Sequence, residues 1–324
     1  MNKIKWGILG YATIAQEAFI PALLKAANSE FYAIASRHSD KLKECQAKFK
    51  APGKVYTDYD ALLSDPEVQA VYIPLPNSLH REWAIKATQH GKHVLCEKPL
   101  ALAAADCHAI IDSAVKNKVK LMEGFMYRYT DRIKKVQHLI QGGDLGEIKY
   151  INAAFYSLAS KASGPRLDPD LGGGSLFDLG CYPVNFIQMI TGSNPVGMAA
   201  QYIGKNGVDQ IFSAVLKYPN NLIANINCGW INEFRSLSAT IMGSKATLEI
   251  PEPFWGNAGS LILTTPAGRQ EITVDESDRF LLEATDFADA ILNDRPPMLN
   301  PAEAVNNAKV IETLIDLTWR KDNK

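Results

Sequence analysis

Short apolar segments alternate with helical patterns through the first 123 residues, and this alternation limits the fold more than any other feature. The apolar segments are Ile4–Leu9, Phe31–Ala35, Val55-Tyr56, Ala70–Ile73, His93–Cys96 and Val119–Glu123. Helical patterns lie between them, for example over Ala104–Asn117. Such alternation is typical of an α/β fold with a doubly wound parallel sheet. We therefore predict that residues 1–123 form one nucleotide-binding domain of this class.

The first turn carries a form of the dinucleotide-binding fingerprint. The strand Ile4–Leu9 ends at Gly10 and a helical pattern begins near Ile14, which is the context that the fingerprint requires. Alanine, the smallest substitution, stands at the second and third glycine positions, Ala12 and Ala15. We predict cofactor contacts from the turn, namely Gly10, Tyr11, Ala12, Thr13 and Ile14. An ordinary buried turn is the alternative. Pro21 should kink or shorten the helix that follows.

The residues after the second strand bear on the choice between NAD and NADP. An acidic residue about 20 positions past the fingerprint would bind the free ribose hydroxyl of NAD. Ser36, Arg37 and His38 stand there instead. A hydroxyl and a guanidinium suit a 2′-phosphate, so the sequence favours NADP as cofactor, with NAD as the alternative. A solvated arginine after a strand is the structural alternative.

Two later strands also end in residues suited to ligand binding. Ligands of open α/β sheets bind at the carboxyl ends of the strands. The fourth segment ends in Pro74-Leu75-Pro76-Asn77, with His80 in the next helix. We predict that Pro74, Leu75, Asn77 and His80 line the cofactor, although Asn77 could instead cap the helix. The fifth segment runs directly into Glu97-Lys98-Pro99, and the rigid Lys98-Pro99 step should direct the lysine towards a ligand.

The spacing His90-x-x-His93-x-x-Cys96 contains three metal-ligating residue types. Gly91 and Lys92 separate a helix end from the next strand, so His90 should lie on the helix and His93 on the strand. His93 and Cys96 then face opposite sides of that strand. We therefore predict no metal site.

The second half of the chain has a different pattern, with longer segments in which apolar and polar residues alternate. Alternating segments cover Ile148–Tyr156, Asp209–Lys217, Leu222–Trp230, Ser238–Met242, Ala246–Ile250, Leu261–Thr264 and Gln270–Val274. Helical patterns cover Thr130–Gln141, Phe280–Leu292 and Ala302–Trp319. We predict a C-terminal α/β domain over residues 124–324, with a large, mainly antiparallel sheet whose helices lie on one face. The open face would be a homodimer surface.

A glycine-rich stretch precedes two candidate site residues. Gly172-Gly173-Gly174 lets the backbone run close to a ligand or a neighbouring element. Asp178 and Tyr182 are spaced to share a helix face. Pro183 suggests that this helix starts late or kinks there. The alternative is an ordinary helix start, with Asp178 as a cap and Tyr182 in the core.

Charge and cysteine usage narrow the function classes. The net charge of −1 provides no field that would attract nucleic acid or an anionic membrane. The sequence contains no apolar run of about 18 residues and begins without a signal-peptide pattern. Five dispersed cysteines without a Cys-x-x-Cys pair indicate free thiols in a reducing, cytoplasmic compartment. We expect a small-molecule substrate as the partner.

Three motifs occur in order: Gly7–Ala15, Glu97-Lys98-Pro99, and Gly173–Tyr182. With them the chain resembles, over essentially its whole length, the glucose–fructose oxidoreductase, inositol dehydrogenase and rhizopine-catabolism family (Gfo/Idh/MocA). It is most similar to the branch of dimeric dihydrodiol dehydrogenases and NADP-linked xylose dehydrogenases, which also carries Ser-Arg after the second strand and tyrosine in the third motif.

This resemblance implies an N-terminal Rossmann domain and an open-faced C-terminal domain often used for dimerisation. Packing of the last helix back on the Rossmann domain stays open. It implies that Lys98 is the catalytic lysine, and that Asp178 and Tyr182 are the acidic and proton-transferring residues. The fingerprint turn, Ser36, Arg37, the Pro74–Asn77 loop and Glu97 would line the cofactor. The Lys98-Pro99 bond is often cis in this family.

The predicted activity is hydride transfer between NADP and a secondary alcohol or carbonyl, or a hemiacetal carbon, of a sugar, polyol or trans-dihydrodiol. Substrate contacts are expected from Phe125–Arg128 and Ser160–Asp168, with Arg128 and Arg166 binding hydroxyls or an anion. Asp178 would accept a hydrogen bond from a neighbouring substrate hydroxyl or hold Lys98. Solvated surface arginines are the alternative. A non-catalytic dinucleotide sensor or regulator on the same fold stays open, because a fold does not fix a function. NADP-dependent chemistry of another kind also stays open.

Overall fold

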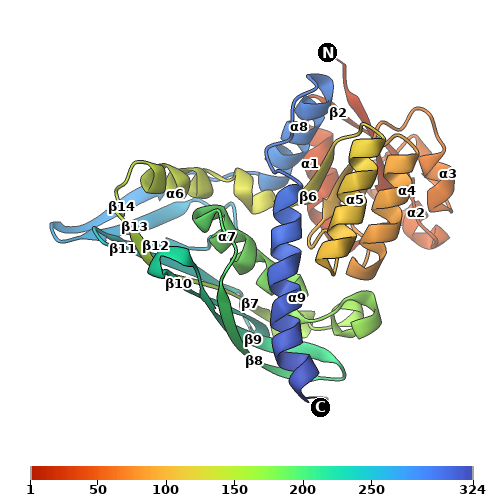
Figure 1. Cartoon of the computed structure of the whole chain (residues 1–324). Helices are drawn as coiled ribbons and strands as arrows, with labels where there is room; N and C mark the ends of the chain where they lie inside the picture. The colour runs from red at the N-terminus through yellow and green to blue at the C-terminus, as the bar shows by residue number, and fades with distance from the viewer. Residues whose placement is uncertain (1, 323–324) are drawn as a thin grey trace. The chain divides into compact units, whose positions relative to one another are not determined.

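The computed structural model describes residues 2–322, and Figure 1 shows the course of the chain. Their contacts divide into two compact units. The first unit consists of Met1–Met126 with Phe280–Val305, and the second of Tyr127–Arg279 with Asn306–Lys324. The first unit therefore includes a segment that follows the second unit in the sequence.

The first unit contains a six-stranded, all-parallel sheet in the order β3-β2-β1-β4-β5-β6. Its strands are β1 (Ile4–Leu9), β2 (Ser29–Ala35), β3 (Lys54–Tyr56), β4 (Ala70–Ile73), β5 (His93–Glu97) and β6 (Leu121–Gly124). Its helices are α1 (Ile20–Lys25), α2 (Ser39–Phe49), α3 (Tyr59–Leu63), α4 (His80–Gln89), α5 (Ala104–Lys116) and α8 (Arg279–Leu292). The strand order reverses between β1 and β4, where such sheets bind nucleotides. The predicted doubly wound Rossmann sheet is confirmed.

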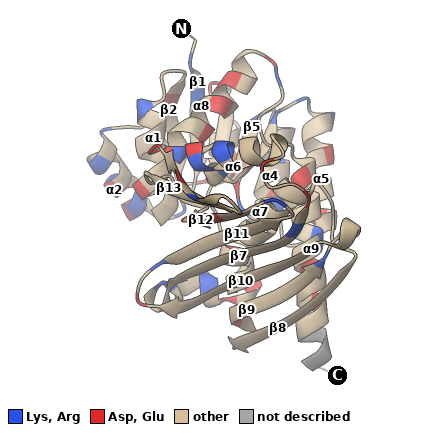
Figure 2. Cartoon of the chain, turned by 90° about the vertical axis from the view of Figure 1, so that its left-hand side faces the viewer, with Lys and Arg blue, Asp and Glu red and all other residues tan. Residues whose placement is uncertain are grey.

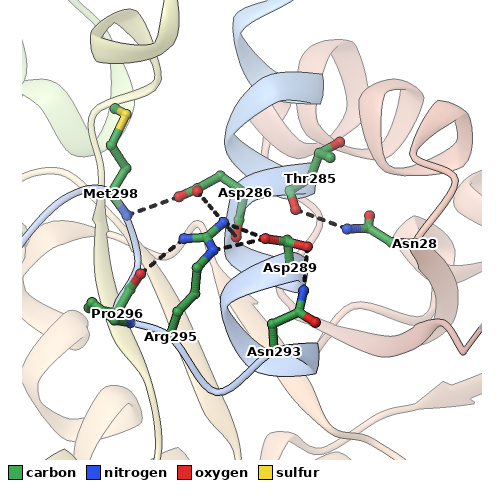
Figure 3. Close-up of polar contacts among 8 residues, drawn as sticks. All are labelled: Asn28, Thr285, Asp286, Asp289, Asn293, Arg295, Pro296 and Met298. Atoms are coloured by element: carbon green, nitrogen blue, oxygen red, sulfur yellow. Dashed lines mark hydrogen bonds and ion pairs between the residues drawn. The ribbon is translucent and has the colours of Figure 1, made fainter.

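Helix α8 joins the first unit through its apolar face and through polar contacts. Phe287 of α8 packs 5.7 Å from the ring of Trp6, which is fully buried in β1. The side-chain amide of Asn28 donates to the Thr285 carbonyl oxygen at 2.9 Å (Figure 3). Arg295 binds the carboxylates of Asp286 and Asp289 at 2.6 and 2.8 Å (Figure 3). These contacts fix the end of α8 and the turn after it.

The second unit contains an eight-stranded sheet in the order β14-β13-β12-β11-β7-β10-β9-β8. Its strands are β7 (Ile148–Leu158), β8 (Gly197–Lys205), β9 (Val208–Lys217), β10 (Ile223–Asn232), β11 (Ser236–Gly243), β12 (Thr247–Pro251), β13 (Gly259–Thr265) and β14 (Gly268–Val274). Its helices include α6 (Asp131–Gln141), α7 (Cys181–Thr191) and most of α9 (Ala302–Asp322). All strand pairs are antiparallel except β7 with β10. The mainly antiparallel sheet is confirmed.

One strand of this sheet was missing from the sequence prediction. Strand β8 is an edge strand whose residues are half-buried or exposed throughout. An edge strand that lacks a buried face does not show the apolar alternation by which strands are predicted. The backbone pairing of β8 with β9 holds this segment in the strand conformation, which its own residue pattern does not predict.

The two faces of the sheet differ. On β10, Ala224, Ile226 and Cys228 are buried, and α7 packs on β10 and β7. The intervening residues of β10 point to the other face, which Figure 2 shows towards the viewer. Few lysine, arginine, aspartate or glutamate residues lie on the central strands of that face (Figure 2). The expected helix-covered and open faces are therefore both present.

Two helices contain π-helical turns just before a proline. The segments are η1 (Ala15–Phe19), followed by Pro21 in α1, and η7 (Leu176–Gly180), followed by Pro183 in α7. A proline inside a helix lacks an N–H and its ring crowds the carbonyl oxygen four residues earlier, so a wider turn accommodates it. Helical structure around Pro183 therefore begins earlier than the sequence suggested, at Leu176.

All five cysteine thiols are free and buried. Within residues 2–322, none of the helices combines the length and the apolarity needed to cross a bilayer.

Candidate active site

The fingerprint turn of the first unit needs glycine at its first position. Gly10 has a φ of +102°, and a Cβ built on it would lie 3.0 Å from the Leu75 side chain. Helical structure begins at Thr13, and both Thr13 and Ile14 are exposed. A turn without side-chain bulk that leads into a helix start suits the phosphates of a dinucleotide.

The side chain of Tyr11, the next residue of the turn, is buried in the protein interior. Its ring is 2% exposed, and burial beside Cys45 of α2 raises the pKa of Tyr11 to about 12. The phenol therefore belongs to the packing between the turn and α2. Ala12, which is half-buried, adds little bulk to the turn.

The residues after β2 present a buried hydroxyl and an exposed cation. The Ser36 hydroxyl accepts a hydrogen bond from the His38 backbone N–H at 3.2 Å, which shapes the loop. Arg37 and His38 are exposed. The guanidinium carbon of Arg37 lies 5.9 Å from the centre of the Tyr59 ring. Residues suited to a 2′-phosphate thus lie at the carboxyl end of β2, which neighbours β1 in the sheet.

His80 connects the loops that follow β4 and β5. Its ring is fully buried, with Nδ1 2.8 Å from the Pro99 carbonyl oxygen and Nε2 2.8 Å from the Leu75 carbonyl oxygen. Burial lowers the pKa of His80, as does the charge of Lys98, while the two carbonyl contacts oppose this shift. His80 therefore fixes the Pro74–Asn77 loop against the Lys98-Pro99 step.

The Glu97-Lys98-Pro99 motif is held by buried hydrogen bonds. The Tyr72 hydroxyl donates to Glu97 Oε1 at 2.6 Å, and the Leu100 backbone N–H donates to Glu123 Oε1 at 2.8 Å. The Lys98-Pro99 bond is cis, as the resemblance led us to expect. Lys98 itself is half-buried at the carboxyl end of β5.

These groups share one edge of the first-unit sheet, because the carboxyl ends of parallel strands lie at the same edge. Gly10 follows β1, Arg37 follows β2, Pro74 follows β4 and Lys98 follows β5. The bare turn, the helix start and the exposed guanidinium match the pyrophosphate and phosphate groups of a dinucleotide cofactor. The residues present therefore fit such a cofactor.

The second unit joins two residues that the sequence analysis assigned to substrate binding. Nε of Arg166 donates to Asp178 Oδ2 at 2.8 Å. The backbone N–H of Gly174 donates to the Arg166 carbonyl oxygen at 2.9 Å, and a Cβ on Gly173 would lie 2.6 Å from that oxygen. The glycine run therefore lets the loop that carries Arg166 pack directly against the start of the helix that carries Asp178.

Asp209 of β9 anchors the start of that helix. Its Oδ2 accepts hydrogen bonds from the Ser175 hydroxyl at 2.5 Å and from the Leu176 backbone N–H at 2.8 Å. A Cβ on Gly174, whose φ is +117°, would lie 2.3 Å from Asp209 Oδ1. Burial raises the pKa of Asp209, against these hydrogen bonds. A carboxylate at a helix N-terminus is stabilised by the unpaired N–H groups there.

Tyr182 lies in α7 among aromatic rings. Its ring is 6% exposed, with centroids 5.2 Å from Phe155 and 5.5 Å from Phe254. One turn later on α7, Asn185 Oδ1 accepts from the Tyr127 hydroxyl at 2.6 Å and from Arg128 at 3.3 Å. Arg128, which we expected at the substrate, is thus buried on α7.

Sequence reasoning missed several residues that shape these sites, namely Tyr59, Asn185 and Asp209. Asn185 follows Tyr182 by three positions, and this spacing was a usable signal because such residues are neighbours on a helix. Asp209 lies at the start of β9, far along the chain, and its sequence context gives no sign of a contact with Leu176. The contact between Tyr59 and Arg37 likewise forms only when folding brings α3 next to the loop after β2.

His90 and His93 of the His90-x-x-His93-x-x-Cys96 motif have structural positions in the first unit. His90 ends α4, and His93 Nδ1 accepts a hydrogen bond from the Lys120 backbone N–H at 2.9 Å. Burial lowers the pKa of His93 to about 4, helped by the charge of Lys120. Among residues 2–322, no three histidine, cysteine, aspartate or glutamate side chains are arranged to hold a metal ion.

Comparison with known families decides the identity of the chain. The family description "Oxidoreductase family, NAD-binding Rossmann fold" matches residues 4–125, and the GFO/IDH/MocA C-terminal domain matches residues 133–249. The chain belongs to the Gfo/Idh/MocA family. This family member is an NAD(P)-dependent oxidoreductase, so the predicted resemblance and enzyme class are confirmed.

Relatives of this Gfo/Idh/MocA protein include proteins named as dehydrogenases and reductases. D-xylose 1-dehydrogenase (NADP(+)) 2 of Haloferax volcanii is 32% identical over 316 residues, which cover 96% of each chain. Trans-1,2-dihydrobenzene-1,2-diol dehydrogenase of Xenopus tropicalis is 32% identical over 263 residues, which cover 80% of this chain and 78% of the relative. A 3-ketoreductase of Actinomadura kijaniata, solved with NADP and TDP-benzene, has a TM-score of 0.89 at 27% identity, with 98% of both chains covered. That reductase was also crystallised with one lysine or one tyrosine replaced.

Proposed function

We propose that this oxidoreductase uses NADP to oxidise a secondary alcohol or hemiacetal carbon of a sugar, polyol or trans-dihydrodiol, or to reduce the corresponding carbonyl. The observation that carries the choice of NADP is the loop after β2. It presents the Ser36 hydroxyl and the exposed Arg37 guanidinium where NAD enzymes of this fold hold a carboxylate. The named NADP-linked xylose dehydrogenase and the NADP complex of the 3-ketoreductase support the same choice.

The protein's chemical task is positioning and proton transfer, since the bound cofactor supplies the hydride acceptor or donor. We assign Tyr182 as the group that takes the hydroxyl proton during oxidation and returns it during reduction. A free tyrosine has a pKa of about 10, and a nearby ammonium favours its phenolate. Lys98 is assigned as that ammonium and as the donor to the substrate oxygen when negative charge develops there.

Asp178 and Arg166 are assigned to substrate recognition. They form an ion pair at 2.8 Å, and a carboxylate and a guanidinium are both groups that hydrogen-bond hydroxyls. Both side chains retain exposure to solvent, with 22% of the Asp178 side chain and 46% of the Arg166 side chain accessible. The pair can therefore bind neighbouring hydroxyls of a polyhydroxylated substrate.

The test of this function is turnover across a substrate panel. The full chain is incubated with NADP and, separately, aldoses, polyols and trans-dihydrodiols, and NADPH formation is followed by absorbance. We expect oxidation of at least one class, with NADP used more efficiently than NAD. Cofactor binding without turnover of any compound, in either direction, would favour the sensor function instead.

We also propose that two copies of the chain form a homodimer through the open face of the second-unit sheet. Ile203, Val215, Ile223 and Met242 all point to this face by strand register, and they are 66%, 46%, 36% and 43% exposed. Between them lie uncharged polar residues, such as Asn225, whose amide donates to the Tyr150 hydroxyl at 2.8 Å. A broad apolar surface with few charges is typical of an interface between identical subunits.

The dimer proposal predicts the effect of a charge on that face. Val215→Lys should raise the dimer dissociation constant by about tenfold or more, because an unpaired ammonium would be buried at the interface. Sedimentation equilibrium on the wild-type chain and the variant measures this change. Val115→Lys is the matched control, since Val115 is 72% exposed on α5. A monomeric wild-type chain, or a Val215→Lys dimer of unchanged stability, would contradict the proposal.

A further inference from the structure

Tyr59 contacts two parts of the proposed cofactor site. It is the first residue of α3 and follows β3, the strand beside β2 in the sheet. Its ring is 6% exposed. A Cβ built on Gly10 would lie 3.7 Å from the Tyr59 hydroxyl, and the Arg37 guanidinium carbon lies 5.9 Å from the ring centre. Tyr59 therefore connects the fingerprint turn with the cation that follows β2.

The position of the Tyr59 ring is itself fixed. The Trp83 indole packs edge-on against it, with ring centres 4.9 Å apart. The Lys86 ammonium lies 4.2 Å from the centre of the Trp83 ring and pairs with Asp60 at 3.3 Å. The Asp58 carboxylate accepts from the Ala61 N–H at 3.2 Å and caps α3. These contacts fix the position of the Tyr59 ring.

Such a ring changes what Arg37 can do. An exposed arginine loses conformational freedom when it binds a phosphate, and this loss weakens binding. A ring that already holds the guanidinium reduces the loss, while an uncharged phenol leaves the positive charge available to an anion. Burial raises the pKa of Tyr59, which the Arg37 charge partly opposes, so the phenol is neutral at physiological pH. A carboxylate in the same place would instead neutralise Arg37.

We propose that Tyr59 is a positioning residue that sets the preference for NADP over NAD by holding Arg37 in place for the 2′-phosphate. This inference rests on the proposed NADP-dependent function. It assigns the cofactor preference to a residue of α3, outside the fingerprint and outside the Ser36-Arg37 loop.

Equilibrium binding of the two cofactors tests the inference. Dissociation constants of NADP and NAD are measured by calorimetry for the wild-type chain, Tyr59→Leu, Arg37→Gln and the double variant. We expect Tyr59→Leu to weaken NADP binding about tenfold, or ~1.4 kcal/mol, and NAD binding less than about twofold. In the Arg37→Gln background the same change should have no further effect on NADP, because the two residues act as one unit.

Two outcomes would overturn the inference: equal weakening of NADP and NAD, or a full tenfold loss in the Arg37→Gln background. If Arg37→Gln leaves the NADP-to-NAD ratio unchanged, the NADP assignment fails first, and the inference fails with it. Circular dichroism and thermal unfolding check that the variants fold. Should Tyr59→Leu not fold, Tyr59→Met fills a similar volume without a ring, and the same results are expected of it.

Discussion

We expect turnover to fall by about 100-fold to 10,000-fold when Tyr182 is replaced by phenylalanine, because the proposed proton-transferring hydroxyl is then absent. The variant keeps the ring that packs on Phe155 and Phe254, so the fold is retained. Lys98→Met, which keeps an unbranched side chain without charge, is expected to lower turnover to a similar degree. Steady-state NADPH formation with the best substrate of the panel measures both effects.

The controls separate chemistry from binding. NADPH affinity, measured by fluorescence titration, should change by no more than a few-fold in either variant. Tyr32→Phe in β2 and Lys116→Met at the end of α5 make the same chemical changes at residues outside the proposed site, and their turnover should equal that of the wild-type chain. Wild-type turnover in Tyr182→Phe or Lys98→Met would refute the assigned roles.

The second large effect concerns the cofactor. Arg37→Asp should weaken NADP binding by on the order of 100-fold, since it replaces an attractive charge beside the 2′-phosphate by a repulsive one. NAD binding should weaken far less, because a carboxylate in that place can accept hydrogen bonds from the free ribose hydroxyls. Calorimetric titration of the two cofactors gives the ratio directly.

A change in overall charge must be distinguished from loss of a specific contact. Lys43→Asp in α2 changes the charge by the same amount at a highly exposed residue and should leave the NADP-to-NAD ratio unchanged. If Arg37→Asp weakens the two cofactors equally, Arg37 does not bind the phosphate, and the preference must be explained by other residues.

Local patterns were enough to predict most of the fold. The strands of the first unit, the glycine turn after β1 and the Lys98-Pro99 step each depend on residues that are close together in the sequence. Apolar alternation and turn residues therefore identify them without knowledge of the fold. Edge strand β8 lacks that alternation and was missed.

The partners of the site residues depend on tertiary packing rather than on the local sequence. Arg166 was predicted at the substrate, but its pairing with Asp178 depends on the glycine run that lets two backbone segments touch. Arg128 was predicted there too, which stays a prediction, and in the structure it is buried and donates to Asn185. Whether a polar side chain is exposed or paired depends on what packs on it, and one local sequence does not specify this.

The sequence by itself determined which segments form most of the strands, where the nucleotide-binding turn lies and which residue types the proposed chemistry uses. Each of these features depends on neighbours along the chain. Only the tertiary structure decided that α8 packs on Trp6, that Asp209 anchors the helix of Asp178, and that Tyr59 contacts Arg37. These contacts join segments separated in the sequence, and their residues acquire a role only when folding brings the segments together.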